Sequence, residues 1–347
     1  MQNSRRSRAV TLKDLAEQSG LTTAAVSMIL NGRGKFKVET VAKVREIAEK
    51  LNYVPNVNAY RLVKQQTNLI GLLVPNINAP FTIEVLCGVE AALKGSGYNL
   101  VIYSTTGKAE EEEKIYREIA RGKQVDGIVV QLFDHSERRT KLFSSFQLPC
   151  VVIEADLKSL DSISVDNVLG AFEATEYLIK MGRKKIIFVY ASQSTVMKER
   201  LEGYLSALKK HRIPPLKEHI LEIESSEVEK FHFDEGVKIV RLVQEKIDKK
   251  EMPKFDAVFC ANGDEVAAGV IRGLGTLNLR VPQDVAVIGY DDQPIARTAI
   301  PALTTVRQPI QEMGSKAVKF LLNRLENPKH KPQVLRINPE LILRETA

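Results

Sequence analysis

The sequence predicts a small all-α helix-turn-helix domain followed by an α/β core made of two doubly wound parallel-sheet subdomains. Residues 11–32 carry apolar residues at helical spacing on both sides of a glycine. From residue 69 onward, short apolar runs alternate with helical patterns, which is typical of parallel sheets covered by helices. The chain has 347 residues, enough for several domains with cores of their own.

Residues 11–32, with the sequence TLKDLAEQSGLTTAAVSMILNG, predict two short helices joined by a tight turn. Thr11 and Thr22 are expected to cap these helices, because a threonine hydroxyl accepts a hydrogen bond from a first-turn backbone N–H. Gly20 supplies the backbone freedom of the turn. The inward face is expected to contain Leu12, Leu15, Ala16, Val26, Ile29 and Leu30.

The outer face of the second helix carries Thr23, Ala24, Ser27 and Met28. A recognition helix presents such a face to base edges in the major groove, so this pattern predicts DNA binding. Two alternatives stay open from the sequence. The helices could form a hairpin inside another kind of domain, and Met28 could pack only against a third helix.

Positive charge is concentrated in the amino-terminal part of the chain. Residues 1–67 contain twelve Lys or Arg and five Asp or Glu, a net charge of +7. The whole chain also has a formal charge of +7, so residues 68–347 are neutral overall. This distribution is the one expected for phosphate contacts with DNA, although non-specific binding to a polyanion would use the same charges.

A third helix is predicted from Val38 to Leu51, where apolar residues follow the helical period. It would complete a helix-turn-helix domain at residues 11–54, preceded by a basic flexible arm at residues 1–10. Residues 55–67 begin with a proline and predict either a short hinge helix or an ordinary linker. A helix of this length is not stable alone in water, which suits a segment that folds only on a partner.

Residues 68–347 alternate between strand-like and helical segments. Apolar runs predict strands at residues 70–74, 100–103, 127–130, 151–153, 186–190, 257–260 and 285–289. Helical patterns lie between them at residues 83–93, 111–121, 138–146, 171–180, 199–209, 235–245 and 266–274. This order predicts right-handed crossovers, and the units are too many for one open sheet, so two similar subdomains are expected.

Ligands of such sheets bind outside the carboxyl ends of the strands, so polar and aromatic residues there are candidates for a binding site. A guanidinium, carboxylates, amides and an aromatic ring are the groups that bind a polyol. Each carboxylate could instead cap a helix or form a salt bridge. The expected ligand contacts are Asn78, Phe81, Ser104, Glu154, Arg200, Asn262, Asp264 and Asp291.

Several sequence motifs occur in a fixed order along the chain. They are TLKDLAEQSGLTTAAVSMILNG, LNYVPNVNAYRL, IGLLVPNINAPF, VDGIVV, DNVLGA, RLEGY, VPQDVAVIGYDD and PALTTVRQP. In this order and spacing they resemble the lactose-repressor (LacI/GalR) family of bacterial regulators over essentially the whole chain. The resemblance implies a DNA-reading domain, a hinge helix that folds on the operator, and a periplasmic-binding-protein-like core that binds an effector and dimerises.

The resemblance also implies where the core is divided. The chain is expected to cross between subdomains three times, near Ser164, Pro294 and Pro328. The N-subdomain would then contain residues of about 68–164 and 295–328. The C-subdomain would contain residues of about 165–294 and 329–347.

Individual residues match positions of known role in the family. Leu62, in AYRL, matches the leucine that inserts into the minor groove at the operator centre. Arg200 and Asp291 match the effector-binding arginine and aspartate, Glu154 falls at another acidic pocket position, and Phe81 lies at the pocket mouth. The expected DNA contacts are Thr11, Thr22, Thr23, Ala24, Ser27, Met28, Asn31, Lys35, Tyr53, Asn56, Ala59, Arg61 and Leu62.

Two departures from the family pattern affect recognition. Met28 stands where the family often has an arginine, so the strong guanine contact of an arginine is missing and a different operator is expected. Gly263 stands where sugar-responsive members often have an asparagine, and Asn262 precedes it. This second departure leaves the hydroxyl pattern of the effector open.

The sequence favours neither catalysis nor a metal or cofactor. Its five histidines share no metal-ligand spacing, and it contains no HExxH, P-loop or GxSxG motif. Its three cysteines lie far apart in apolar runs and are expected to be buried free thiols. With no signal peptide and no membrane-spanning stretch, a cytoplasmic protein is expected, which counts against an exported sugar-binding protein.

The predicted function is a sequence-specific transcriptional regulator, expected to act as a repressor, that binds a pseudo-palindromic operator as a homodimer. A small-molecule effector, expected to be a sugar or sugar derivative, would switch its affinity for DNA. One alternative is control by a protein co-repressor such as a phosphorylated carrier protein. A non-regulatory sugar-binding protein and an enzyme of the same fold are further alternatives.

Overall fold

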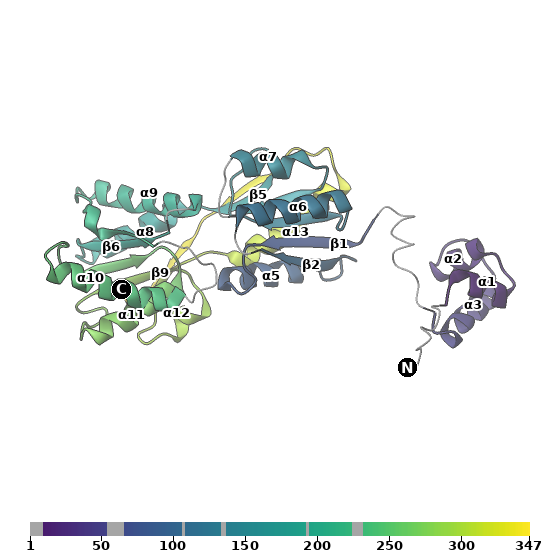
Figure 1. Ribbon diagram of the computed structural model, residues 1–347, viewed down its shortest axis with the longest axis horizontal. Coiled ribbons are helices and arrows are strands. Elements are labelled where there is room, and N and C mark those ends of the chain that lie inside the picture. The colour runs from purple at the N-terminus through teal and green to yellow at the C-terminus, as the bar shows by residue number, and fades with distance from the viewer. Residues whose placement is uncertain (1–9, 54–65, 106–107, 133–136, 192–193, 224–231) are drawn as a thin grey trace, which may run out of the picture. The chain divides into compact units, whose positions relative to one another are not determined.

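The computed structural model describes residues 10–53, 66–105, 108–132, 137–191, 194–223 and 232–347. The chain divides into two compact units, Met1–Thr67 and Asn68–Ala347 (Figure 1). The predicted fold class is confirmed, because a helical unit precedes an α/β unit with two sheets.

The amino-terminal unit contains three helices, α1 (Leu12–Ser19), α2 (Thr23–Leu30) and α3 (Val38–Lys50). Helix α1 begins with a capping box, in which the Asp14 carboxylate accepts the Thr11 backbone N–H at 2.7 Å. Gly20 ends α1 in the left-handed conformation, at φ 72°. The unit's core consists of the buried residues Leu15, Ala16, Val26, Ile29 and Val44.

The first sheet of the carboxy-terminal unit has six parallel strands. Their order is β11 (Val334–Ile337), β5 (Asp161–Val165), β4 (Cys150–Ile153), β3 (Gly127–Gln131), β1 (Leu69–Val74) and β2 (Asn99–Ser104). The strand order reverses between β1 and β3. In doubly wound folds, ligands bind beside such a reversal, outside the carboxyl ends of the strands.

The second sheet repeats this arrangement. Its order is β12 (Glu340–Ile342), β10 (Thr304–Arg307), β9 (Ala286–Asp291), β8 (Ala257–Cys260), β6 (Ile186–Tyr190) and β7 (Ile220–Glu222). All pairs are parallel except β12 with β10. The order reverses between β6 and β8, so the second sheet has its own switch point.

Helices cover both faces of each sheet (Figure 1). On the first sheet, α5 (Pro80–Leu93) and α13 (Ile310–Glu326) cover one face, whereas α6 (Ala109–Gly122) and α7 (Glu137–Ser145) cover the other. On the second sheet, α8 (Asn167–Lys180) and α9 (Thr195–Lys210) lie opposite α10 (His232–Asp248) and α11 (Asp264–Thr276). The near-continuous apolar strands follow from this burial on two faces.

Helices α8 and α9 approach each other closely at Gly203. A Cβ atom on Gly203 would lie 2.2 Å from the carbonyl oxygen of Val168. Only glycine permits this approach without a shift of backbone. The contact matters for the ligand site, because α9 also carries Arg200 and α8 begins at Asn167.

The chain passes between the two sheets three times, through very short segments. The first crossing is Asp166, between β5 and α8. The second crossing is residues 308–309, between β10 and α13, and the third is residues 338–339, between β11 and β12.

Two of these crossings differ from the expected positions. The second does not lie near Pro294, because α12 (Pro294–Thr298) and β10 still pack with the second sheet. The third does not lie near Pro328, because β11 returns to pair with β5 in the first sheet. The first subdomain therefore takes residues 310–337, and the second extends through residue 307.

Several elements lack the apolar run that marks a strand in sequence. Strands β5 and β10 bury Ser162, Thr304 and Thr305 completely, so small polar residues occupy positions where apolar ones were sought. The expectation of three buried thiols is wrong for Cys87, which is exposed on α5, whereas Cys150 and Cys260 are buried. Within the described ranges, none of the helices has both the length and the apolar character needed to traverse a bilayer.

Candidate functional site

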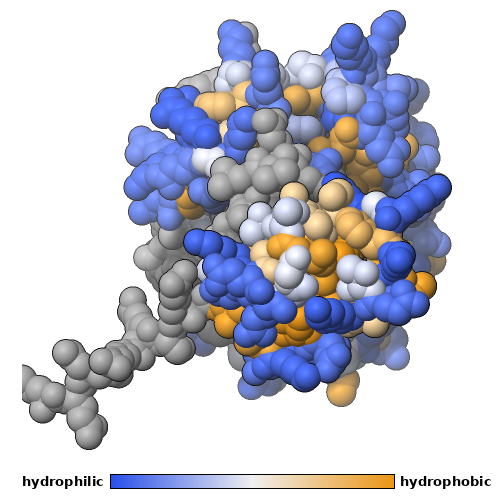
Figure 2. Space-filling model, turned by 90° about the vertical axis from the view of Figure 1, so that its right-hand side faces the viewer, coloured by the Kyte–Doolittle hydropathy of each residue, from blue (hydrophilic) through white to orange (hydrophobic). Residues whose placement is uncertain are grey.

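The outer face of α2 is open to solvent. Thr23, Ala24 and Met28 are exposed, and Ser27 is half-buried. Met28 has 42% of its surface exposed and lies outside the unit's buried core. The alternative that Met28 only packs against α3 therefore fits the structure poorly. On the face shown in Figure 2, hydrophobic residues are surrounded by hydrophilic side chains.

Some expected DNA contacts also shape the local backbone. The Thr22 hydroxyl accepts a hydrogen bond from the Ala25 backbone N–H at 3.2 Å, so it caps α2 while remaining exposed. The Asn31 side chain donates to the Ser27 carbonyl at 2.7 Å and closes the end of α2. Lys35 is exposed, and the half-buried Tyr53 packs against the core.

Four of the expected DNA contacts lie outside the described residues. They are Asn56, Ala59, Arg61 and Leu62. Their roles remain predictions from the sequence.

In the carboxy-terminal unit, Arg200 is the best-defined candidate. It is 2% exposed and lies at the first turns of α9, directly after β6. Its Nε donates to Asn167 Oδ1 at 2.9 Å, and its Nη1 donates to the Ala261 carbonyl at 2.6 Å. Its guanidinium also lies over the Tyr290 ring, 3.6 Å from the ring centroid. A buried arginine with this many contacts has a fixed orientation.

Asp291 ends β9 and lies beside Arg200, with 4.0 Å between Oδ1 and the arginine Nη2. Gln308 donates to the same oxygen at 2.6 Å, and Gln293 donates to the other at 3.3 Å. Asp291 has a φ of 101°, a left-handed value that is strained for a residue other than glycine. Such strain persists only where surrounding contacts impose it, and it is frequent at functional sites.

Glu154 belongs to the same group of charges, although it follows β4 of the first sheet. It is 6% exposed, and its φ of 67° is also left-handed. Burial raises the pKa of Glu154 to about 8, and the Asp291 charge adds to this rise, against the opposing effects of Arg200 and a hydrogen bond with Gln131. The carboxyl is therefore largely protonated at neutral pH and can donate as well as accept.

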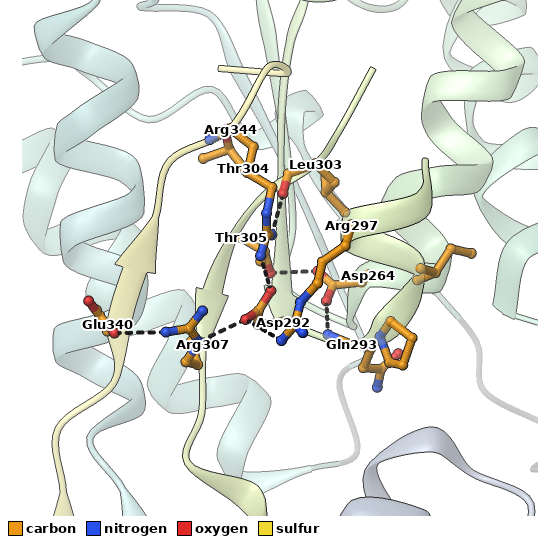
Figure 3. A network of polar contacts seen from close by, with 12 residues as sticks. Asp264, Asp292, Gln293, Arg297, Leu303, Thr304, Thr305, Arg307, Glu340 and Arg344 are labelled. Carbon is orange, nitrogen blue, oxygen red and sulfur yellow. Dashed lines mark hydrogen bonds and ion pairs between the residues drawn. The ribbon is translucent and has the colours of Figure 1, made fainter. Parts of the chain in front are cut away.

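Asp264 supports the loop that carries Asp291, and Figure 3 shows its side chain bonded to Gln293 and Thr305. Its side chain is fully buried, and its two oxygens accept the Gln293 backbone N–H at 2.7 Å and the Thr305 hydroxyl at 2.5 Å. Burial and the nearby charge of Asp291 hold the pKa of Asp264 well above its usual value. Both oxygens already accept hydrogen bonds from protein groups, which indicates a structural role for Asp264, and its contact with a ligand stays a prediction from the sequence.

Asp292 anchors the other side of the same loop (Figure 3). It accepts hydrogen bonds from Arg307 at 2.7 Å, from Arg297 at 3.3 Å and from Arg344. Burial alone would raise the pKa of Asp292, but the hydrogen bonds from Arg344 and Arg307 outweigh it and lower the value. The network fixes the β9–α12 loop, and with it the position of Asp291.

Asn262 and Gly263 follow β8, beside the switch point of the second sheet. Gly263 has φ 123° and ψ 171°, a conformation that only glycine adopts readily. The structure thus gives a backbone reason for the glycine that departs from the family pattern. The Oδ1 atom of Asn262 is buried and has no hydrogen bond within the described part of the chain.

For the remaining candidates, a role in ligand binding stays a prediction from the sequence. Asn78 is exposed, and its backbone N–H donates to the Asn76 side chain at 2.8 Å. Ser104 is exposed at the end of the edge strand β2. Phe81 is 8% exposed and packs into the core beneath the first sheet.

Besides Gln293, sequence reasoning missed three residues that contact the Arg200–Asp291 pair. Asn167, Tyr290 and Gln308 are all buried. Each lies within a quoted motif, DNVLGA, VPQDVAVIGYDD or PALTTVRQP, so a signal was present. Nothing in the local pattern, however, indicated that their side chains would converge.

Comparison with known proteins places these observations in a family. Residues 11–56 match the family described as bacterial regulatory proteins, lacI family, and residues 175–347 match a periplasmic binding protein-like domain. The ribose operon repressor of Haemophilus influenzae is 35% identical over 339 residues, covering 97% of this chain and 98% of that repressor. The transcriptional repressor PurR of Vibrio vulnificus is 34% identical over 342 residues, covering 97% and 98%.

Solved structures share the fold. The Lac repressor dimer bound to operator and the anti-inducer ONPF has a TM-score of 0.85 at 23% identity, covering 98% of this chain and 99% of that chain. The regulator CelR in complex with cellobiose has a TM-score of 0.70 at 27% identity, covering 97% and 100%.

Proposed function

Because the chain belongs to the lacI family of bacterial regulatory proteins, we propose that it is a transcriptional repressor whose affinity for a DNA operator is switched by a small molecule. The family is one of regulators and not of enzymes. The observation that carries the proposal is the open, capped helix α2 in a unit that holds the chain's net positive charge.

We assign recognition of the DNA sequence to the exposed face of α2. Thr22, Thr23, Ala24 and Met28 project from a helix whose opposite side is locked in the core by Val26 and Ile29. Hydroxyls can bond base edges, and the methionine and alanine can contact thymine methyl groups. One such unit makes few contacts, so we assign the protein a homodimer on a pseudo-palindromic operator, with cytoplasmic DNA as its partner.

Selection of duplexes from a random pool by the full-length protein tests this assignment. The expected result is a two-fold symmetric consensus that is bound at least about a thousandfold more tightly than random DNA, as specific DNA-binding proteins do. Recovery of no preferred duplex would contradict the proposed function.

The effector is assigned to the group formed by Glu154, Arg200 and Asp291. Arg200 is the one cation among these side chains in the described part of the chain, and Asp291 already neutralises it. A phosphate or carboxylate ligand would meet the Asp291 carboxylate without a free cation to offset its charge. A hydroxyl can donate to Asp291 and accept from Arg200, so we assign an uncharged, hydroxyl-bearing ligand such as a sugar.

The names of two relatives support this class without fixing the ligand. One relative is a ribose operon repressor, and one solved relative holds cellobiose. Calorimetric titration of the full-length protein with ribose, cellobiose and ribose 5-phosphate tests the class. We expect an uncharged sugar to bind at least about tenfold more tightly than the phosphate ester, and the reverse order would contradict the assignment.

A further inference from the structure

Two hinge crossings each contribute a buried side chain that contacts the Arg200–Asp291 pair. Asn167 directly follows the first crossing at Asp166, and Gln308 begins the second crossing after β10. Asn167 is 4% exposed and Gln308 is 5% exposed. Hydrogen bonds of such buried groups are costly to break, so their partners are held in place.

Asn167 joins both sides of the first crossing to Arg200. Its Nδ2 donates to the carbonyl of Val165, the last residue of β5, and to Glu199 Oε2, each at 3.2 Å. Its Oδ1 accepts from Arg200 Nε at 2.9 Å. One amide therefore contacts the first sheet, helix α9 and the guanidinium.

Gln308 makes the corresponding contact at the second crossing. Its Nε2 donates to Asp291 Oδ1 at 2.6 Å. Its own carbonyl accepts the Ile310 backbone N–H at 2.9 Å around Pro309, which has φ −80° and ψ 61°. These values describe an inverse γ-turn, a compact bend whose geometry depends on few dihedral angles.

The Arg200–Asp291 pair connects the two crossings. Asn167 bonds Arg200, Arg200 lies 4.0 Å from Asp291, and Asp291 accepts from Gln308. The third crossing is joined to the first through the backbone, since the Asp166 N–H donates to the Ile337 carbonyl at 2.9 Å. Its side-chain contact near the site, between Arg336 and Glu199 at 3.8 Å, is screened by water because Arg336 is 41% exposed. The buried side-chain contacts with the Arg200–Asp291 pair therefore come from the first two crossings.

We propose that Asn167 and Gln308 are positioning residues that link the first two hinge crossings through the Arg200–Asp291 pair. A ligand held by the pair then acts on both crossings at once. The inference rests on the proposed function, because the pair is assigned to the effector. It goes beyond that function by naming the residues through which occupancy reaches the hinge, where a few residues absorb the change in domain angle.

Hydrogen exchange of the full-length, ligand-free protein tests the link directly. Asn167→Ala is expected to raise the amide exchange rate at least fivefold at residues 304–313, around the second crossing, as well as near residue 167. Gln308→Leu is expected to raise the amide exchange rate at least fivefold at residues 163–169, around the first crossing. A purely local structural role would raise exchange only around the substituted residue, and that result would overturn the proposal.

A matched control is available on helix α13, which directly follows the second crossing. Gln311 is exposed and donates to Glu84 at 2.6 Å, a contact within the first subdomain. Gln311→Leu is expected to leave exchange at residues 163–169 unchanged. If Asn167→Ala does not fold, Gln308→Leu and the milder Asn167→Ser provide the same comparison.

A ligand arm separates this inference from the proposed function. Wild type and Gln308→Leu are titrated with ribose and cellobiose by calorimetry, and with the selected operator in the presence of each sugar. We expect the dissociation constant of Gln308→Leu for the sugar to lie within tenfold of the wild-type value. Adding the sugar should change the operator affinity of Gln308→Leu less than twofold, whereas it should change the operator affinity of wild type at least fivefold. If the sugar changed the operator affinity of Gln308→Leu as much as that of wild type, the inference would be overturned. If wild type bound neither sugar, the proposed effector class would be contradicted. The hydrogen-exchange comparison would then still test the link between the two crossings.

Discussion

The guanidinium of Arg200 lies over the ring of Tyr290, with its central carbon 3.6 Å from the ring centroid. Tyr290 comes from the strand β9 that ends in Asp291, so one strand supplies both the ring beneath the guanidinium and the carboxylate beside it. These contacts fix the orientation of the guanidinium, and with it the direction of the Nη2 group that lies beside Asp291. The proposed effector site is therefore pre-organised.

Replacing the Tyr290 ring should weaken ligand binding more than removing its hydroxyl. Tyr290→Phe keeps the ring and removes only the hydroxyl, whose hydrogen bond to Asn167 is long at 3.5 Å, so ligand affinity should change less than about threefold. Tyr290→Leu removes a cation–π contact of about 0.5–2 kcal/mol and should lower the affinity for the sugar by roughly tenfold. Calorimetry of both variants checks this order, and equal losses would argue against a role for the ring.

The raised pKa of Glu154 should make folding stability depend on pH. Between the usual value near 4.5 and the folded value of about 8, the unfolded state loses its proton while the folded state keeps it. The free energy of unfolding should therefore fall as pH rises through this range. Glu154→Gln lacks the group, so its stability relative to wild type should grow by more than about 1 kcal/mol from pH 5 to pH 8.

Denaturant unfolding of both proteins at several pH values measures this difference. A gap between wild type and Glu154→Gln that stays constant from pH 5 to pH 8 would show that Glu154 titrates normally in the folded protein.

Met28 should affect DNA sequence preference and not stability. It is 42% exposed, so Met28→Ala should leave the thermal midpoint within about 2 °C and change the preferred base at one or two operator positions. Its neighbour Ile29 is 2% exposed, and Ile29→Ala should destabilise the unit by about 2–5 kcal/mol. Duplex selection with Met28→Ala that returned the wild-type consensus would remove Met28 from the readout.

Leu62, which lies outside the described residues, should be needed for tight operator binding. If its side chain inserts between base steps as in the family it resembles, Leu62→Ala should weaken operator binding by at least about tenfold without changing sugar affinity. Fluorescence anisotropy with the selected operator, alongside calorimetry, measures both quantities. Undiminished operator binding would exclude the hinge leucine from recognition.

Much of the fold could be predicted from sequence because its burial follows simple periodicity. The strands β1, β4 and β8 are uninterrupted apolar runs, and α1 and α2 have caps that are visible in the sequence. The second and third crossings could not be located this way. Their positions depend on which sheet a short segment such as β11 joins, and its alternating burial does not distinguish the two.

The site was predictable in part for a similar reason. Arg200, Asp291 and Glu154 carry charges near strand ends, so position and residue type together indicated a function. Asn167 and Gln308 are neutral amides whose role depends on a partner far away in sequence. Asp264 shows the opposite case, because a charged residue at a strand end proved to be enclosed by Gln293 and Thr305.

Operator affinity of the full-length protein, measured with and without a saturating uncharged sugar that binds it in calorimetry, tests the central claim most directly. Reciprocal linkage requires that operator and sugar change each other's affinity by the same factor, which we expect to be at least about fivefold. An operator dissociation constant that is the same with and without bound sugar would contradict an effector-switched repressor.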